Sequence, residues 1–291
     1  MEHKKRNITG LTFLIMGIIV LVIGIIAVNN TDMSKYKKTS GIKKTDSVQT
    51  YNADNVKDIK IEFGTNNYTV IFDENTDKIT VDSKGIYENS ASVSVDGDTF
   101  EYRTNENTIL DFGPFKFHFF NLDFSRLADI SSFSDIGKLF DEGDGEVCIT
   151  LPAKDYDDVK IGCGIGNTSI KGNSNSKELK ISAGVGNLSI DGLKAKTAKL
   201  SAGVGNIKGD NVSFDDFDLS AGIGNIDLRG FVGDTKVSCG TGNVKLTILG
   251  SESDYDIDED DADIHGDGKS NGGDYDLKIS SGLGDCDIYF E

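Results

Sequence analysis

The sequence predicts an all-β protein: a β-solenoid of stacked coils of about 19 residues, preceded by one N-terminal transmembrane helix. Three observations predict it. A Gly-x-Gly-Asn motif recurs at nearly constant spacing, the strands beside each copy alternate apolar and polar residues, and one long apolar segment lies near the N-terminus. The 34 glycines and only 2 prolines among 291 residues suit a chain that turns many tight corners.

The apolar segment comprises residues 8–28 and contains no charged side chain. As a helix it would span about 31 Å, close to the roughly 30 Å hydrocarbon core of a bilayer. A cleavable signal peptide is the alternative, but the segment is longer than a usual signal core and no small-x-small cleavage site follows it. We therefore expect an uncleaved anchor in the lipid bilayer, with residues 1–7 as a cytoplasmic tail.

Basic residues flank this segment on both sides, three before it and five within residues 29–52. The positive-inside count alone slightly favours a cytoplasmic domain. Because a seven-residue tail before a first span usually stays in the cytoplasm, we expect a single-pass protein of the cell membrane with its C-terminal domain extracellular. Residues 29–52 are predicted to be a flexible linker, and residues 53–291 the β-repeat domain.

The motif Gly-x-Gly-Asn occurs five times, and a sixth copy ends in Asp285. The second glycines of the five copies are 20, 19, 19 and 18 residues apart, and the last interval is 42, about two periods. Such self-similarity is typical of stacked repeats, in which neighbouring coils bury one another's apolar faces. The predicted structural turn residues are Gly164, Gly166, Asn167, Gly184, Gly186, Asn187, Gly203, Gly205, Asn206, Gly222, Gly224, Asn225, Gly240, Gly242 and Asn243.

The residues around each motif predict a strand, a corner and a second strand. Apolar and polar residues alternate up to Val185, and the apolar phase shifts by one after Asn187. Such a shift turns side chains to the wrong face unless the chain bends there. We therefore expect Val185 and its counterparts Val204 and Ile223 to face a common interior. The asparagines are expected to hydrogen-bond along the stack as a ladder.

A further coil is recognisable near residue 56, where Ile59 and Val70 fit the apolar columns and Asn67 fits the asparagine column. Between residues 84 and 145 the period is interrupted by an insertion with an aromatic run and a stretch of helical periodicity. We expect this insertion to cap the open N-terminal end of the stack. The alternative is an exposed apolar surface that contacts a membrane or a partner.

Another unusual coil replaces the glycine corner with a run of acidic residues. When its apolar residues are aligned with those of the other coils, Asp263 comes to lie directly above Asp285. Carboxylate oxygens are preferred ligands of Ca²⁺, so a calcium site is one interpretation. A solvated loop whose charges discourage edge-to-edge association is the other. The candidate metal ligands are Glu259, Asp261, Asp263 and Asp285, and no other cofactor is expected.

The four cysteines include no Cys-x-x-Cys pair. Cys163 and Cys239 fall in one column of small inward residues, and Cys286 falls in the neighbouring apolar column. Because Cys163 and Cys239 are four coils apart, roughly 19 Å, they are too distant for a disulfide. We interpret the cysteines as small buried side chains, and a bridge between Cys148 and Cys163 remains the alternative.

The formal net charge of −18 is unevenly placed: residues 1–44 carry +6, so the remainder carries −24. A domain this acidic repels phosphate backbones, which argues against nucleic-acid binding. The histidines at 3, 118 and 265 are too scattered for a histidine-based catalytic centre. A glycosidase needs paired carboxylates in a groove, and one crowded acidic corner does not supply them, so no catalytic residues are expected.

The segment 146–152, followed by 160–167 and the later copies of the motif, resembles the bacterial β-strand-repeat family known as "putative adhesin", a domain of unknown function. Its members share a short strand ending in Leu-Pro and then successive strand-Gly-x-Gly-strand units. The resemblance covers roughly residues 54–291 apart from the insertion. It implies a β-repeat fold, common in Gram-positive bacteria and often behind one membrane anchor, and it implies no catalytic residues.

These features together predict a membrane-anchored, adhesin-like protein of the cell surface that binds or senses an envelope protein or a cell-wall polymer without catalysis. Two alternatives stay open. One is a surface enzyme that acts on polysaccharide, and the other is a cytosol-facing regulatory sensor, which the basic residues after the apolar segment support.

Overall fold

The computed structural model describes residues 43–64, 66–104, 108–112, 115–119, 145–260, 262–266, 268 and 272–291. These residues are all-β, and their strands form one 15-stranded sheet and one 2-stranded hairpin. None of them belongs to a helix long and apolar enough to cross a membrane, and the predicted anchor at 8–28 lies outside the described residues.

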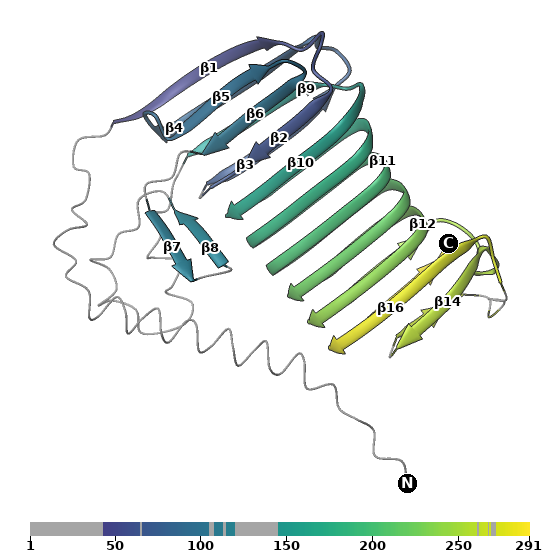
Figure 1. Ribbon diagram of the computed structural model, residues 1–291. Coiled ribbons are helices and arrows are strands. Elements are labelled where there is room, and N and C mark those ends of the chain that lie inside the picture. Colours follow the sequence, from purple (N-terminus) through teal and green to yellow (C-terminus); the bar gives the residue numbers. More distant parts are fainter. Residues whose placement is uncertain are drawn as a thin grey trace, which may run out of the picture.

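Parallel strands in successive coils form the body of the protein (Figure 1). They are β10 (Asp155–Ile165), β11 (Thr168–Ile223), β12 (Ile226–Thr241) and β13 (Val244–Ile248), and β11 runs through several coils without a break. Equivalent residues of neighbouring coils lie side by side, as in the pairs Ile161–Ile181 and Leu219–Val237. The solenoid-like stack predicted from the repeat is therefore present.

The coils at the N-terminal end are not stacked in sequence order. β2 (Asp58–Glu62) lies between β10 and β6 (Thr99–Thr104), and β3 (Asn67–Asp73) lies between β11 and β9 (Glu146–Pro152). The coil of β6 and β9 is therefore the outer layer. Its two strands end and begin at Thr104 and Glu146, where the inner coils have a glycine corner.

Antiparallel strands widen both faces of this outer layer. β1 (Lys44–Asn52) pairs with β4 (Lys78–Tyr87), β4 pairs with β9, and β5 (Ala91–Asp96) pairs with β6. The only other strands described before β9 are β7 (Thr108–Phe112) and β8 (Phe115–Phe119), which form an antiparallel hairpin.

Two boundaries predicted from the sequence are therefore wrong. Residues 44–52, expected within the linker, form an edge strand, and residues 84–104, expected within the insertion, belong to the sheet. β1 resembles a linker in composition because an edge strand exposes most of its side chains. The antiparallel pairing of β4 and β5 breaks the 19-residue period without leaving the sheet.

The last strands of the chain are inserted beneath an outer coil at the C-terminal end. β16 (Tyr275–Leu283) lies between β12 and β14 (Tyr255–Asp260), and β17 (Cys286–Phe290) lies between β13 and β15 (Asp263–His265). A 3-10 turn at Glu252–Asp254 leads into β14. Figure 1 shows β16 between β12 and β14, so that the acidic coil of β14 and β15 is the outer layer.

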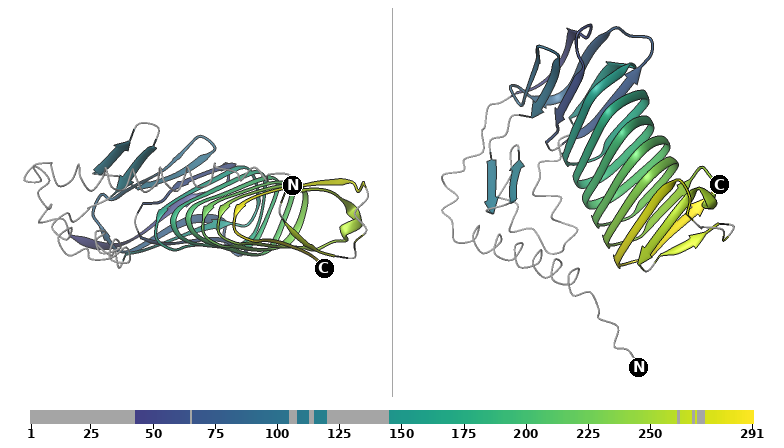
Figure 2. Two further views of the ribbon diagram at one scale, coloured as in Figure 1. Left: turned by 90° about the horizontal axis from the view of Figure 1, so that it is seen from below. Right: turned by 45° about the vertical axis from the view of Figure 1, so that its right-hand side comes forward.

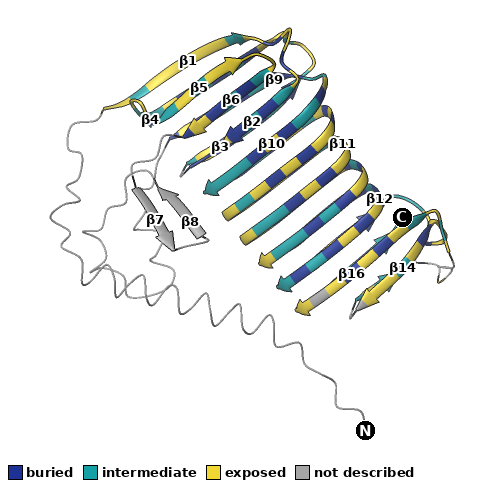
Figure 3. Ribbon diagram, viewed as in Figure 1, coloured by how far each residue is buried: buried dark blue, intermediate teal, exposed yellow. Residues whose placement is uncertain are grey.

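The coils are flattened, as Figure 2 shows, and the buried apolar side chains lie between their two faces. Buried and exposed residues alternate along the strands, as Figure 3 shows, because successive side chains of a strand point to opposite faces. Isoleucine, leucine and valine fill the middle of the stack, and each such side chain contributes about 1.5–3 kcal/mol when fully buried. The largest fully buried side chains include Tyr102, Tyr156, Tyr255, Phe100 and Phe214.

Candidate functional site

The inner coils pass from one face to the other at glycine corners that no larger residue could form. In all six copies of the motif the second glycine has a φ between +130° (Gly166) and +156° (Gly284). A Cβ on Gly186 would lie 1.9 Å from the carbonyl oxygen of Gly166, and a Cβ on Gly224 would lie 1.7 Å from that of Gly205. The glycines are therefore required both by their backbone conformation and by the close approach of stacked backbones.

The residue between the two glycines points outward, so an apolar ridge runs along this edge of the stack. Val185, Val204 and Ile223 occupy this position in three consecutive coils and are 43–47% exposed, and we call them the corner ridge. Leu283 is 50% exposed but is separated from Ile223 by Thr241 of the coil between them. Isolated exposed apolar side chains are ordinary on protein surfaces, but a contiguous row of them marks an interaction surface.

The corner ridge overturns the expectation that Val185, Val204 and Ile223 face the interior. These residues do lie in neighbouring coils, because the glycine corners stack directly on one another. However, the alternation of inward and outward residues breaks between Ala183 and Val185, earlier than the shift expected after Asn187. In the coil of Val185 the last side chain that packs against the core is therefore Ala183.

Amide side chains beside the ridge form a continuous ladder of hydrogen bonds. Nδ2 of Asn187 donates to Oδ1 of Asn167 at 3.0 Å, and Nδ2 of Asn206 donates to Oδ1 of Asn187 at 2.9 Å. Side-chain contacts of 3.3–3.4 Å extend the row to Asn67 and Asn225. At the far end the backbone N–H groups of Asn243 and Asp285 continue it, at 3.2 and 3.3 Å from the preceding Oδ1. The ladder expected from the sequence is thus formed, and we call it the amide ladder: Asn67, Asn167, Asn187, Asn206, Asn225 and Asn243.

A trough of about 620 Å³ lies along the amide ladder and crosses five coils. One charged residue lies at each end, Glu146 in β9 and Lys208 in β11. Buried side chains such as Leu188 form its floor. We call it the polar trough, because its other described lining residues include the amides and hydroxyls of Asn67, Thr69, Asn167, Ser169, Asn187, Ser189 and Asn206.

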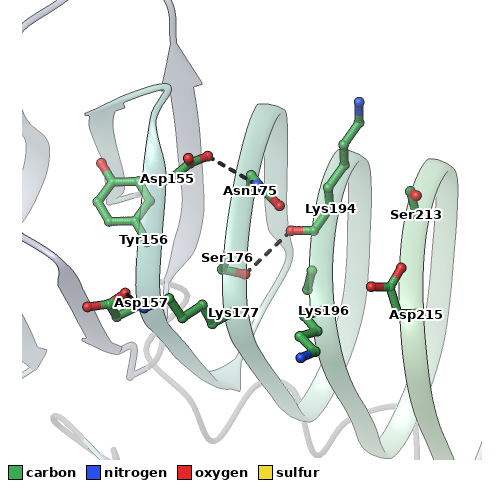
Figure 4. A pocket seen from close by; sticks show the side chains of 11 residues that line it. Asp155, Tyr156, Asp157, Asn175, Ser176, Lys177, Lys194, Lys196, Ser213 and Asp215 are labelled. Carbon is green, nitrogen blue, oxygen red and sulfur yellow. Dashed lines mark hydrogen bonds and ion pairs between the residues drawn. The ribbon is translucent and has the colours of Figure 1, made fainter.

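A second hollow, of about 400 Å³, lies on the opposite edge of the stack (Figure 4). Nζ of Lys177 pairs with Oδ1 of Asp157 at 2.6 Å, and this hydrogen bond lowers the pKa of Asp157. Figure 4 shows Lys194 and Lys196 pointing away from each other. Three lysines and three aspartates line the hollow, so it gathers no net charge and is a weak candidate for binding an ion.

The acidic coil does not form the corner predicted for it. Asp263 pairs with Asp287 and not with Asp285, while Asp260 pairs with Ser280. Two residues therefore separate Asp260 from Asp263, whereas six separate their register partners Ser280 and Asp287 in the neighbouring coil. The alignment that placed Asp263 above Asp285 is wrong because the outer corner is four residues shorter than the glycine corners.

The predicted calcium ligands are not brought together by this arrangement. Asp261 lies outside the described residues, and Oε2 of Glu259 accepts a hydrogen bond from the backbone N–H of Ala262 at 2.9 Å. In the part of the chain that the structure describes, no group of three or more His, Cys, Asp or Glu side chains could hold a metal ion.

The four cysteines are all free thiols, so the alternative of a Cys148–Cys163 bridge is wrong. Cys163 pairs in register with Ala183, and Cys286 pairs with Val244, as their columns predicted. Burial raises the pKa of Cys163 to about 11 and that of Cys286 to about 12. These thiols therefore stay protonated at neutral pH, unlike the thiolates of reactive cysteines.

The sequence interpretation missed the polar trough, although the sequence carries a signal for it. A hydroxyl residue follows the ladder asparagine by two positions in three coils, at Thr69, Ser169 and Ser189. Residues two apart on a strand share a face, so this spacing indicates a polar strip beside the ladder. The strip becomes a trough only through the stacking of the coils.

These features define a rigid stacked β-repeat domain that presents one continuous edge, with the corner ridge and the amide ladder, to solvent. The chain belongs to the Toastrack DUF4097 family, whose model matches residues 56–290. This confirms the resemblance to the β-strand-repeat family expected from the sequence. No curated protein matches the chain.

Solved structures that align with the chain come from several bacteria. A putative adhesin from Bacteroides fragilis NCTC 9343 aligns with 17% identity and a TM-score of 0.49, over 84% of this chain and 97% of that one. A putative cell adhesion protein from Clostridium sporogenes ATCC 15579 aligns with 14% identity and a TM-score of 0.38, over 86% and 100%. A putative lipid binding protein from Parabacteroides distasonis ATCC 8503 aligns with 10% identity and a TM-score of 0.34, over 84% of this chain and 96% of that one.

Proposed function

We propose that this protein is a non-catalytic, adhesin-like binding module of the bacterial cell surface, anchored in the membrane by residues 8–28. The observation that carries the proposal is the corner ridge beside the amide ladder. A row of apolar side chains 43–47% exposed in three consecutive coils is unusual on a domain with a charge of −24, and such rows mark interaction surfaces.

The chemistry of the same edge supports binding without catalysis. Glu146 is the single carboxylate among the described residues that line the polar trough. Hydrolysis of a glycosidic bond needs two carboxylates that flank the bond, and Glu146 has no such partner there. The thiols of Cys163 and Cys286, whose pKa values desolvation raises, are protonated at neutral pH and offer no nucleophile.

The stacked fold suits a module that must present a surface without changing shape. Each corner is fixed by glycines that touch the backbone of the next coil and by amide hydrogen bonds along the stack. A preorganised surface loses little conformational entropy on binding. The anchor would hold this surface close to the envelope and raise its effective concentration for envelope components.

Two measurements on the full chain test this proposal, one on intact cells and one on beads that carry the protein. Trypsin added to intact cells should degrade the domain, whereas a cytosol-facing domain would survive. Beads that carry the full chain should retain labelled envelope fragments. The triple variant V185S/V204S/I223S should lose at least about 80% of this retention, because it removes about 1 kcal/mol or more of apolar contact at each position.

The control variant carries three substitutions on the opposite edge of the same coils: K177S/K194S/K196S. It should retain envelope fragments as well as the wild type. Equal loss in both triple variants, or protection from trypsin in intact cells, would contradict the proposal.

A further inference from the structure

The polar trough offers a repeated set of hydrogen-bonding groups that the protein itself does not use up. Each primary amide has two N–H donors and a carbonyl oxygen that can accept two hydrogen bonds. Within the ladder, Asn187 donates once to Asn167 and accepts once from Asn206. Asn167 likewise donates once to Asn67 and accepts once from Asn187. Each of these two exposed amides therefore keeps one donor and one acceptor for a ligand.

A ligand that matches such pairs must donate and accept at the same place. Hydroxyl groups do both, whereas a phosphate or an ionised carboxylate only accepts. The hydroxyls of Ser169 and Ser189, beside the two amides, repeat the same dual character in the same coils. The lining of the trough therefore favours a polyhydroxylated ligand over an anion.

The negative charge of the domain also favours an uncharged ligand. The chain beyond residue 44 carries −24, which repels anionic polymers over the whole domain. A cationic polymer would be attracted to the acidic surface in general, but the middle of the trough has no carboxylate to hold it. An uncharged ligand is not repelled by the domain and does not need a carboxylate in the middle of the trough.

The length of the trough indicates a polymer. It crosses five coils, and at a strand spacing of about 4.8 Å this corresponds to about 19 Å. Its volume of about 620 Å³ lies in the usual range of ligand sites. An extended peptide is a poorer match, because such peptides pair with the free edge of a sheet. The trough instead crosses strands whose backbones are already paired on both sides.

We propose that the polar trough binds an uncharged polysaccharide chain that lies along the stack, with its hydroxyl or acetamido groups paired to the spare groups of the amide ladder. This inference rests on the proposed function, since it assigns a ligand class to the same edge. The apolar ridge beside the ladder would contact the C–H face of the sugar rings.

The probes are three soluble hexasaccharides: β-1,4-linked glucose, β-1,4-linked N-acetylglucosamine, and α-1,4-linked galacturonic acid as the anionic member. Calorimetry with the full chain in detergent micelles should detect binding of at least one uncharged hexasaccharide and no binding of the anionic one. Preference between the two uncharged probes would tell whether acetamido groups contribute.

The matched variants are S189Y and S182Y, which place the same bulky group at two exposed positions of one coil. Ser189 lines the trough and Ser182 lies on the other side of the glycine corner. Binding should weaken about tenfold or more in S189Y and change less than twofold in S182Y. Both should melt within a few degrees of the wild type, which would show that the fold is kept.

Three outcomes would overturn the inference: no binding of either uncharged probe, binding of the anionic probe alone, or equal loss in both variants. The bead experiment, which measures retention of envelope fragments, distinguishes failure of this inference from failure of the proposed function. If the wild type retains fragments and binds no uncharged probe, the binding module stands and the ligand class is wrong.

Discussion

The backbone N–H of Asp285 donates a hydrogen bond to Oδ1 of Asn243, 42 residues earlier in the chain, at 3.3 Å. The last coil therefore stacks directly on the coil that ends in β13, and the acidic coil between them in sequence lies outside it. The same departure from sequence order occurs at the N-terminal end, where the coil of β2 and β3 lies inside the coil of β6 and β9. Glycine corners are confined to the inner coils.

This stacking order predicts an unusual response to truncation. A chain that ends at residue 274 keeps β14 and β15 but loses β16 and β17, which are their described partners. It should be no more stable than a chain that ends at residue 250, although it is 24 residues longer, because both leave β12 and β13 at the outer edge. Urea unfolding of the two truncated chains checks this.

Limited proteolysis supplies the second readout for the truncated chains. Residues 251–274 should be cleaved rapidly in the longer one and slowly in the intact protein. A higher unfolding midpoint for the longer chain would show that the acidic coil can dock on β12 and β13 directly, contrary to this account.

The glycine corners predict a severe effect of a single methyl group. G186A places a Cβ 1.9 Å from the carbonyl oxygen of Gly166 at a φ of +137°, so it should lower the free energy of unfolding by about 3 kcal/mol or more. Gly162 is the matched control, since a Cβ there has its nearest neighbour at 3.8 Å and no strained φ. G162A should leave the urea midpoint unchanged, and similar losses in both variants would refute the explanation.

The amide ladder predicts a moderate loss when one member is removed. N206A breaks the hydrogen bond to Asn187 and those from Asn225, so it should destabilise the domain by about 1–2 kcal/mol. S189A, in the same trough, should have little effect on the unfolding midpoint measured by circular dichroism. Equal unfolding midpoints for N206A and S189A would show that the amide ladder does not stabilise the domain.

The acidic outer coil predicts that charge keeps the stack from growing. β14 is paired on one side, with β16, and its exposed residues include Asp256 and Asp258. Unpaired strand edges associate unless charge or shape prevents it. D256S/D258S should therefore form higher oligomers in sedimentation velocity experiments. The control D215S/D227S removes two charges from inner coils and should sediment in the same oligomeric state as the wild type.

The buried thiols predict a loss of stability in alkaline solution. The folded-state pKa of Cys163 is raised to about 11 and that of Cys286 to about 12, above the roughly 8.5 of an unfolded cysteine. The stabilisation is therefore fully present below about pH 8.5. Above that pH the unfolded chain loses these protons first, so stability should fall by about 1.4 kcal/mol per pH unit for each thiol.

Chemical denaturation between pH 8 and 10 measures this slope. The variant C163A/C286V adopts the residues found beside these positions in the neighbouring coils, Ala183 and Val244. It should show a flatter dependence in this range, below the pH at which the buried tyrosines ionise. An unchanged slope would show that the alkaline sensitivity lies elsewhere.

Much of the fold followed from the sequence because the repeat is local and periodic. The 19-residue spacing and the alternation of apolar residues predicted the stacked coils, the columns of Cys163 and Cys286, and the amide ladder. The outward direction of Val185 was not predicted, because the apolar pattern shifts after Asn187 whereas the stacked backbone already turns Val185 outward, two residues earlier.

The sequence by itself determined that the coils stack, since no single coil can bury its own apolar face and identical neighbours can bury it. Only the tertiary structure decided the order of the outer coils, because strand pairing between distant segments depends on which free edge is available when they meet. It also decided the site: the corner ridge and polar trough exist only where residues about 19 positions apart lie about 4.8 Å from one another.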